Sequence, residues 1–265
     1  MSAGANEYRM KRVLYITTPG PRAVPVLDAL LEMGCTPLVY VPNEEHFEGR
    51  RVTYWQPRWM GIAKRILRVF DKLFSPTPPH PGETLAQRCR AKGIPVHILP
   101  GHSRLNDSVD YFAELNIDLV VVNNYPFLIG GAFLDEFSGR VINFHSSYLP
   151  SYRGLNQSLR ILANLEPTGG VTLHFVKPGA DTGSIIAQER FALPPDANLT
   201  YYKEQVAEGA ARILRDSWPH LQAGTLGTPQ SHTDQPVMII DEPTSRVLRW
   251  LNKQRRKFGM PPRKI

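Results

Sequence analysis

Apolar runs alternate with helix-like segments along most of the chain. Residues 12–18 (RVLYITT) are apolar and rich in β-branched side chains, typical of a buried strand, and a Pro-Gly-Pro turn follows them. Apolar residues recur at helical spacing over 23–33, Gly34 follows at the position of a helix C-terminal glycine, and residues 37–41 form a second strand-like run. This β-α-β order predicts a parallel sheet with right-handed crossovers.

The same alternation continues to residue 222. Predicted strands cover 96–99, 118–122, 141–145, 170–176 and 184–193, and predicted helices cover 84–92, 106–116, 155–165 and 200–222. The run 118–122 (DLVVV) is expected to be central and buried on both faces. The pattern therefore predicts an α/β protein with an open, mostly parallel twisted sheet and helices on both faces. The predicted main domain is 1–225, and 226–265 is predicted to form a short basic C-terminal extension.

One stretch, residues 141–154, passes from a buried strand into a polar loop. Asn143 and His145 lie two residues apart, so on a strand both side chains leave the same face. An amide donor beside a titratable imidazole suits acyl chemistry, although the same pair equally suits hydrogen bonding at a strand end. Loops at the carboxyl ends of parallel strands meet in one crevice, so we expect this loop to approach 123–131 and the turn after Thr18.

A second polar turn, Asp181-Thr182-Gly183, follows the predicted strand 170–176. Its carboxylate could aim into the same crevice, whereas an aspartate in such a turn more commonly bonds its own backbone. The sequence contains no GxGxxG, P-loop, GxSxG or HExxH motif. The eight histidines include no i, i+4 pair for a metal, and His97 and His174 are predicted to be strand histidines with structural partners.

The net charge of +7 comes from two segments and not from the whole fold. Residues 50–72 hold seven basic residues and one acidic residue, and residues 246–265 hold eight basic residues and no acidic one. Residues 58–74 also have amphipathic helical spacing. Such a helix could lie on an anionic membrane or dock a partner, but we favour a surface helix that packs on the body of the domain.

Cysteine usage and hydropathy limit the class of protein. Cys35 and Cys89 are isolated in the sequence, which argues against a disulfide scaffold and favours buried free thiols. No apolar run is long enough for a transmembrane helix, and the polar N-terminus has no signal-like apolar segment. We therefore expect a cytoplasmic protein.

Taken in order, three motifs resemble those of the folate-dependent formyltransferases. The family pattern N-x-H-x-S-x-L-P-x-x-x-G corresponds to 143–154, G-V-T-x-H to 170–174 and D-x-G to 181–183. The family includes glycinamide ribonucleotide, methionyl-tRNA and amino-sugar N-formyltransferases, which share a Rossmann-like fold. The resemblance covers roughly residues 12–222.

The resemblance implies a catalytic trio of Asn143, His145 and Asp181, with 10-formyltetrahydrofolate as the formyl donor and no metal. Transfer to an amine would pass through a tetrahedral intermediate. Asn143 would donate to the developing oxyanion, and a protonated His145 would add a charge-assisted hydrogen bond. Asp181 would hold the imidazolium and relay the proton that the amine loses.

The resemblance also implies binding residues. The folate would lie against Tyr125, Pro126, Phe127, Leu128 and Ile129 and against the backbone of Lys177, Pro178, Gly179 and Ala180. This loop departs from the family, which has I/L-L-P after its tyrosine or glycine. The acceptor side would include Thr18, Gly20, Ser147, Tyr148, Arg153, Gly154 and Asn156.

The expected acceptor is the primary amine of a small molecule: a nucleotide-linked amino sugar, an amino acid or a secondary-metabolite intermediate. A methionyl-tRNA substrate is disfavoured because those enzymes carry a further C-terminal domain, so nucleic acid is not an expected partner. A 10-formyltetrahydrofolate hydrolase is a second alternative. Alternatives of another class are a nucleic-acid or membrane-surface binding module and a non-catalytic relative. The insert 44–81 would shape the acceptor pocket or provide a homodimer or membrane contact.

Overall fold

The computed structural model describes residues 10–42, 83–98, 105–125, 127–225, 227–231, 252–253 and 256. The predictions for the basic helix at 58–74 and the insert 44–81 fall outside these residues, as do Pro126 and most of the basic tail.

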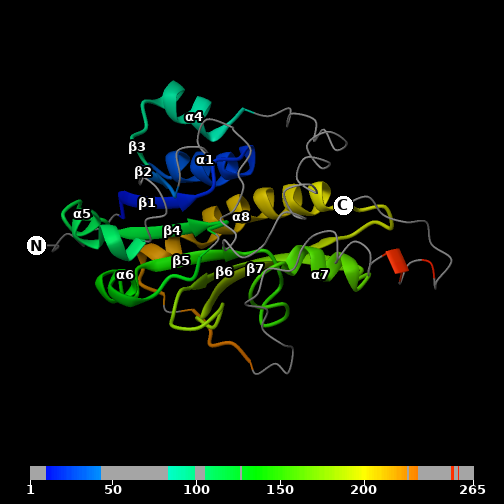
Figure 1. Cartoon of the computed structure of the whole chain (residues 1–265). Coiled ribbons are helices and arrows are strands. Elements are labelled where there is room, and N and C mark those ends of the chain that lie inside the picture. The colour runs from blue at the N-terminus through cyan, green and yellow to red at the C-terminus, as the bar shows by residue number, and fades with distance from the viewer. Residues whose placement is uncertain are drawn as a thin grey trace, which may run out of the picture.

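A mixed β-sheet organises the described part of the chain (Figure 1). Its strands run in the order β3-β2-β1-β4-β5-β6-β7. They are β1 (Arg12–Thr17), β2 (Thr36–Val41), β3 (Val96–Ile98), β4 (Leu119–Asn123), β5 (Val141–His145), β6 (Thr168–Phe175) and β7 (Ile185–Ala192). The strands from β3 to β5 pair in parallel, whereas β6 and β7 are antiparallel to their neighbours. The prediction of a mostly parallel sheet is therefore confirmed.

The connecting helices follow the predicted order with small changes. They are η1 (Pro21–Ala23), α1 (Val24–Glu32), α4 (Leu85–Lys92), η2 (Leu105–Ser108), α5 (Val109–Ala113), α6 (Gly131–Glu136), α7 (Gln157–Ala163) and α8 (Leu199–Gln222). The helix predicted over 106–116 begins as a 3-10 turn, so its α-helical part is short. Helix α6 was not predicted, because six residues beginning at a glycine are too few to show a helical period.

Local sequence signals explain several helix ends. Thr84 and Gln87 form a reciprocal capping box at the start of α4, and the left-handed Gly93 ends it at φ 63°. Gly34 follows α1 with φ 77°, the conformation that the sequence predicts for it. At the start of α8, the Asn198 side chain accepts a hydrogen bond from the Tyr201 amide.

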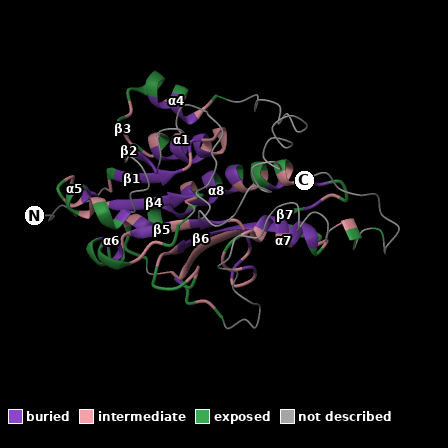
Figure 2. Ribbon diagram, in the orientation of Figure 1, coloured by how far each residue is buried: buried purple, intermediate pink, exposed green. Residues whose placement is uncertain are grey.

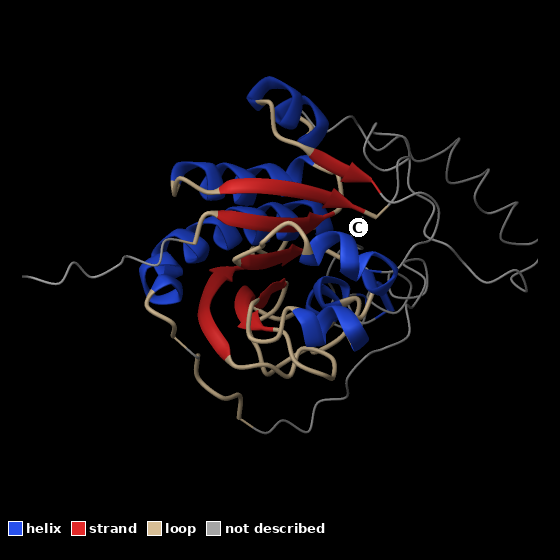
Figure 3. Cartoon of the chain, turned by 90° about the vertical axis from the view of Figure 1, so that its left-hand side faces the viewer, coloured by secondary structure: helices blue, strands red, loops and turns tan. Residues whose placement is uncertain are grey.

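Helices cover both faces of the sheet (Figure 3). On one face, Val121 of β4 belongs to a core cluster that includes residues of α1, α4 and α8. On the other, Val120 and Val122 belong to a cluster with residues of α5 and α6. Every residue of β4 is buried, which confirms its predicted central position (Figure 2). Cys35 and Cys89 are buried in the first cluster and are not joined in a disulfide, as predicted.

Among the described residues, no helix has the length and apolarity needed to cross a membrane.

The strand order brings the predicted loops together. Strands β1, β4 and β5 are adjacent and parallel, so their carboxyl ends share one edge of the sheet. The Asn124 side-chain amide, just after β4, donates a 2.6 Å hydrogen bond to the Thr18 hydroxyl, just after β1. The expected meeting of these two loops is confirmed by this contact.

Candidate active site

Strands β5 and β6 together present a polar row on one face of the sheet. Ile142 and Phe144 enter the core beneath α8, so the alternating residues Asn143 and His145 leave the opposite face. The antiparallel register then sets His174 of β6 directly opposite Asn143. Their side chains meet at 3.1 Å between Asn143 Nδ2 and His174 Nε2.

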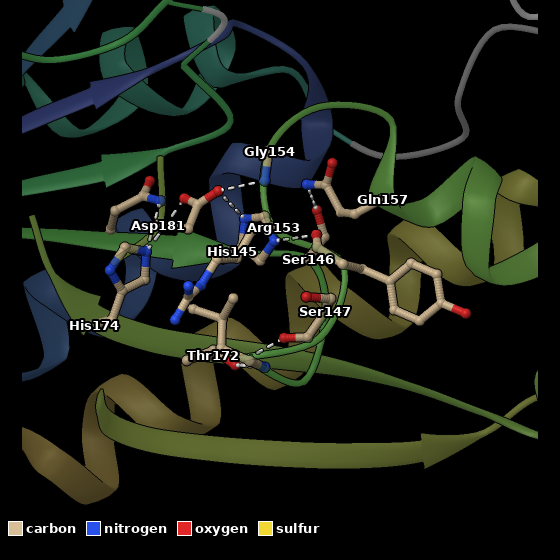
Figure 4. Close-up of polar contacts among 12 residues, drawn as sticks. His145, Ser146, Ser147, Arg153, Gly154, Gln157, Thr172, His174 and Asp181 are labelled. Atoms are coloured by element: carbon tan, nitrogen blue, oxygen red, sulfur yellow. Dashed lines mark hydrogen bonds and ion pairs between the residues drawn. The ribbon is translucent and has the colours of Figure 1, made fainter. Parts of the chain in front are cut away.

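Asp181 lies at the centre of this row (Figure 4). Its Oδ2 accepts a 2.8 Å hydrogen bond from the Gly154 amide and lies 3.4 Å from His145 Nδ1. Its Oδ1 lies 3.6 Å from His174 Nε2. The Asp181 side chain is only 16% exposed, and one carboxylate thus contacts both histidines and the 146–154 loop.

The sequence of the D-T-G turn explains how Asp181 reaches the strands. A Cβ atom on Gly183 would lie 1.7 Å from the Phe175 carbonyl oxygen, so only glycine lets the turn close against the end of β6. Asp181 itself has a left-handed backbone with φ 53°, which aspartate adopts more readily than most residues. The turn therefore folds back along β6 and brings the carboxylate to the histidines.

The surroundings of His145 favour a neutral ring. Its Nε2 lies 2.9 Å from the Tyr152 carbonyl oxygen, so the Nε2–H tautomer donates there and leaves Nδ1 facing Asp181. Burial lowers the pKa of His145, with the Asp181 charge opposing it only in part. The lowered pKa favours the neutral ring in the free protein, and the protonated His145 expected during formyl transfer stays a prediction.

Asp181 stays ionised. Burial raises the pKa of Asp181, but the attraction of the carboxylate for His145 and His174 in their protonated forms and the hydrogen bond from the Gly154 amide outweigh it and lower that pKa to about 2. A carboxylate beside the unprotonated Nδ1 of a histidine is a ready acceptor for one proton, which the pair can then share.

His174 is a site residue that the sequence analysis did not select. Its Nδ1–H donates to the Phe175 carbonyl at 2.8 Å, so Nε2 is free to accept from the Asn143 amide. The prediction of a strand histidine with structural partners holds for Nδ1, whereas Nε2 faces the site. Its position opposite Asn143 becomes visible only once β5 and β6 are known to pair antiparallel.

The loop after β5 is shaped around His145. Tyr152 has a left-handed backbone with φ 61°, and its carbonyl receives the His145 bond. Its ring is buried, its hydroxyl donates to Glu166 and accepts from Asn164, and the Arg160 guanidinium lies 5.2 Å from the ring centroid. These contacts fix the carbonyl that selects the His145 tautomer.

The residues predicted for the acceptor side differ from one another in their contacts. Thr18 and Gly154 are already engaged with Asn124 and Asp181, and a Cβ on Gly20 would meet nothing within 4 Å. Arg153 is half-buried and donates to the Gln230 side chain. Asn156 precedes α7 in a left-handed conformation with φ 57°.

Two further members of that set have other contacts. Ser147 has no exposed surface, and its hydroxyl donates to the Ser151 carbonyl at 2.7 Å. Its side chain therefore shapes the loop and is not accessible to an acceptor, contrary to expectation. The Tyr148 ring lies beneath the Arg190 guanidinium, at 3.9 Å from the ring centroid.

The residues predicted for the folate side are mostly at the surface. Phe127 and Leu128 are 51% and 76% exposed, and the Tyr125 and Phe127 rings meet edge to face. Ile129 packs on the second core cluster. Lys177, Pro178 and Gly179 are exposed, and Ala180 is half-buried. Among the described residues, no group of three or more histidine, cysteine or acidic side chains could hold a metal ion.

Comparison with known proteins identifies the family. The family described as formyl transferase matches residues 80–217, which is more than half of the chain. The chain belongs to the formyl transferase family.

A curated relative and several solved structures show how far the likeness extends. The trifunctional purine biosynthetic protein adenosine-3 of Drosophila melanogaster is 34% identical over 123 residues, which span 44% of this chain and only 9% of the fly protein. Glycinamide ribonucleotide transformylase 1 from Symbiobacterium toebii superposes with a TM-score of 0.62 at 20% identity, covering 84% of this chain and 94% of its own.

Two other solved formyltransferases share the fold equally well. An N-formyltransferase from Helicobacter canadensis, solved with folinic acid and dTDP-3-aminofucose, has a TM-score of 0.60 at 18% identity, covering 87% of this chain and 71% of its own. A sugar 3N-formyl transferase solved with dTDP and 5-N-formyl-tetrahydrofolate has a TM-score of 0.61 at 17% identity, covering 95% of this chain and 82% of its own. These likenesses establish a formyl transferase fold.

Proposed function

We propose that this protein is an N-formyltransferase that moves the formyl group of 10-formyltetrahydrofolate to the primary amine of a small molecule. The observation that carries the proposal is the position of Asp181, an ionised carboxylate held between His145 and His174 beside the Asn143 amide. Membership of the formyl transferase family supports it. Two structural neighbours were solved with formylated folates, which favours the same donor.

The surface beside the site suits a folate. Phe127 and Leu128 expose apolar area on the loop after β4, next to the strand that carries Asn143. A flat heterocycle could cover this area, and the half-buried Ala180 with its exposed neighbours offers backbone groups for hydrogen bonds at ring edges. The donor supplies a formyl group bound to nitrogen. When an amine attacks the formyl carbon, the formyl oxygen gains negative charge.

Asn143 is the group suited to that oxygen. One N–H of its amide is used by His174, and an amide nitrogen has a second N–H to donate. A donor that is already fixed by a neighbouring side chain loses little freedom when the charge develops, so its stabilising effect is large. His174, itself held by the Phe175 carbonyl, orients the Asn143 amide.

Asp181 and His145 together handle the proton. Attack forms a bond from the amine nitrogen to the formyl carbon, transfer breaks the bond from that carbon to the donor nitrogen, and one proton passes from the first nitrogen to the second. The ionised Asp181 accepts this proton from the amine, directly or through a water, and His145 Nδ1 can share it. Protonated Nδ1 would turn its 3.4 Å contact with Asp181 into a charge-assisted hydrogen bond.

Among small amines, we favour a nucleotide-linked amino sugar. Two structural neighbours were solved with a dTDP-linked amino sugar or with dTDP, and the guanidinium of Arg153, the residue before Gly154, suits phosphate recognition. Glycinamide ribonucleotide is the competing acceptor, because the Symbiobacterium neighbour is named as a glycinamide ribonucleotide transformylase and the fly relative as a purine biosynthetic protein.

The test is an acceptor screen. Purified protein is incubated with 10-formyltetrahydrofolate and, separately, dTDP-3-aminofucose, glycinamide ribonucleotide, free amino acids or charged initiator tRNA, and products are read by mass spectrometry. The proposal expects one small amine to gain a single formyl group with equal release of tetrahydrofolate. Formylation of the tRNA alone, or release of formate with every acceptor, would assign one of the two alternative activities instead.

A further inference from the structure

Residues 227–231, which we call the C-terminal strap, lie against the start of β7. Thr228 and Ile185 exchange two backbone hydrogen bonds of 2.8 and 2.7 Å in an antiparallel bridge. Gly227 makes this approach possible, because it has φ 72° and a Cβ there would lie 2.8 Å from the Ile185 carbonyl oxygen. The strap is thus part of the fold beyond α8, and it reaches the D-T-G turn.

The Gln230 side chain uses both ends of its amide in this region. Its Nε2 donates to the carbonyl oxygens of Asp181 and Gly183, at 2.8 and 2.7 Å. Its Oε1 accepts from Arg153, at 3.2 Å from Nε and 2.7 Å from Nη2. Both amide hydrogens and the amide oxygen therefore have partners.

These contacts close a ring around the reactive carboxylate. Gln230 holds the backbone of Asp181 and the side chain of Arg153, and the next residue after Arg153, Gly154, donates to the Asp181 carboxylate. Asp181 is in a left-handed conformation, which persists only when its surroundings hold it. The two carbonyls that Gln230 joins belong to Asp181 itself and to Gly183, so the Gln230 amide ties the residue that carries the carboxylate to the end of its own turn.

We propose that Gln230 is a positioning residue for Asp181 and that the C-terminal strap completes the active site. Gln230 acts by fixing the turn from outside, and it makes no contact with the reacting atoms. The kinetic part of this inference rests on the proposed function, whereas the positioning itself can be measured without any substrate.

The substrate-free test measures, by NMR on the full chain, how fast the Gly154 amide hydrogen exchanges with solvent. Loss of two hydrogen bonds to the turn in Gln230→Ala should loosen Asp181 and speed exchange of the Gly154 amide about tenfold. Gln222→Ala, at the end of α8, is the matched control and should leave that amide unchanged. Gly227→Ala should reproduce the effect by a different route, since it forces the strap away from Ile185.

Gln230→Glu separates the two ends of the side chain. A carboxylate can still accept from Arg153 but cannot donate to the carbonyls of Asp181 and Gly183. The proposal expects Gln230→Glu to speed Gly154 exchange as much as Gln230→Ala does. Wild-type exchange in Gln230→Glu would show that the Arg153 contact alone matters and would overturn the positioning of the turn.

Turnover gives the second readout, with 10-formyltetrahydrofolate and dTDP-3-aminofucose or glycinamide ribonucleotide as substrates. Gln230→Ala should lower kcat about ten- to hundredfold and leave each KM within about threefold, as expected for a misplaced reactive group. Unchanged kcat together with unchanged Gly154 exchange refutes the inference. In a further outcome, the wild type formylates neither amine while Gln230→Ala still speeds Gly154 exchange. That outcome upholds the positioning of Asp181 and counts against the proposed function only.

Discussion

The Gly154 amide donates a 2.8 Å hydrogen bond to Oδ2 of Asp181, across 27 residues of sequence. The bond joins the loop after β5 to the turn after β6, so the two polar motifs of the sequence form one site. Without it, Asp181 would be a turn aspartate near two histidines. With it, the carboxylate has one oxygen directed at Gly154 and His145 and the other at His174.

His174→Gln should separate the site role of this histidine from a structural one. The variant loses the imidazole nitrogen that fixes Asn143 and neighbours Asp181, so we expect kcat to fall about ten- to hundredfold with KM little changed. Steady-state kinetics of the formyl transfer give the measurement. His97→Gln is the control. His97 lies in the edge strand β3 and stacks on Tyr111 of α5, so its replacement should affect stability and leave kcat unchanged. Equal losses of kcat in both variants would make His174 merely structural.

The depressed pKa of His145 makes stability depend on pH. Below the ordinary histidine pKa of 6.5 the unfolded chain takes up a proton that the buried ring refuses, so stability should fall as the pH falls from 6.5. Asp181 adds little to this slope between about pH 5 and pH 7, because an aspartate is ionised there both in the unfolded chain and in the folded protein, where its pKa is about 2. The contribution of His145 is at most about 1.4 kcal/mol per pH unit.

Urea unfolding between about pH 5 and pH 7, for the wild type and for His145→Gln, measures that slope. We expect the variant to lose part of the pH dependence. NMR of the imidazole should in parallel show His145 titrating below 6.5. A titration above 6.5 would mean that Asp181 dominates burial and that the ring is charged in the free protein.

Gly183→Ala should unfold the D-T-G turn. The added methyl would lie 1.7 Å from a backbone oxygen of β6, which cannot move aside without opening the β6–β7 pairing. We expect a loss of about 3 kcal/mol or more in the free energy of unfolding. Gly130→Ala is the control, since a Cβ there meets nothing within 4 Å and its extended backbone suits alanine. Similar stability of the two variants would contradict this account of the turn.

Ser147→Ala tests whether this serine shapes the loop. Because its buried hydroxyl serves the Ser151 carbonyl, we expect a loss of about 1–3 kcal/mol in stability and no change in the KM for the amine. Chemical denaturation and acceptor titrations measure the two effects. A raised KM at unchanged stability would restore the original assignment of Ser147 to acceptor binding.

The sequence predicts most of the sheet because its strands are long apolar runs. It also predicts that Asn143 and His145 share a face, since a strand has a fixed period of two. The antiparallel pairing of β5 with β6 carries no local signal, so the placement of His174 opposite Asn143 could not be foreseen.

Other site features depend on contacts distant in sequence. Gln230 reaches Asp181 across 49 residues, through a strap that shows no periodic pattern. The lowered pKa of His145 follows from its burial, which a sequence motif does not reveal. Ser147 looked like a loop residue facing an acceptor, but the 146–154 loop turns inward there and buries the hydroxyl.

The most direct test of the central claim compares wild type with Asp181→Asn in the transfer of an isotopically labelled formyl group from 10-formyltetrahydrofolate to the amine found in the acceptor screen. Asparagine keeps the shape and can still accept from Gly154, but it cannot take up the proton. The account predicts that Asp181→Asn transfers the formyl group at least about a hundredfold more slowly than the wild type. The surface control Asp135→Asn should unfold as the wild type does. Transfer by Asp181→Asn at the wild-type rate would contradict it.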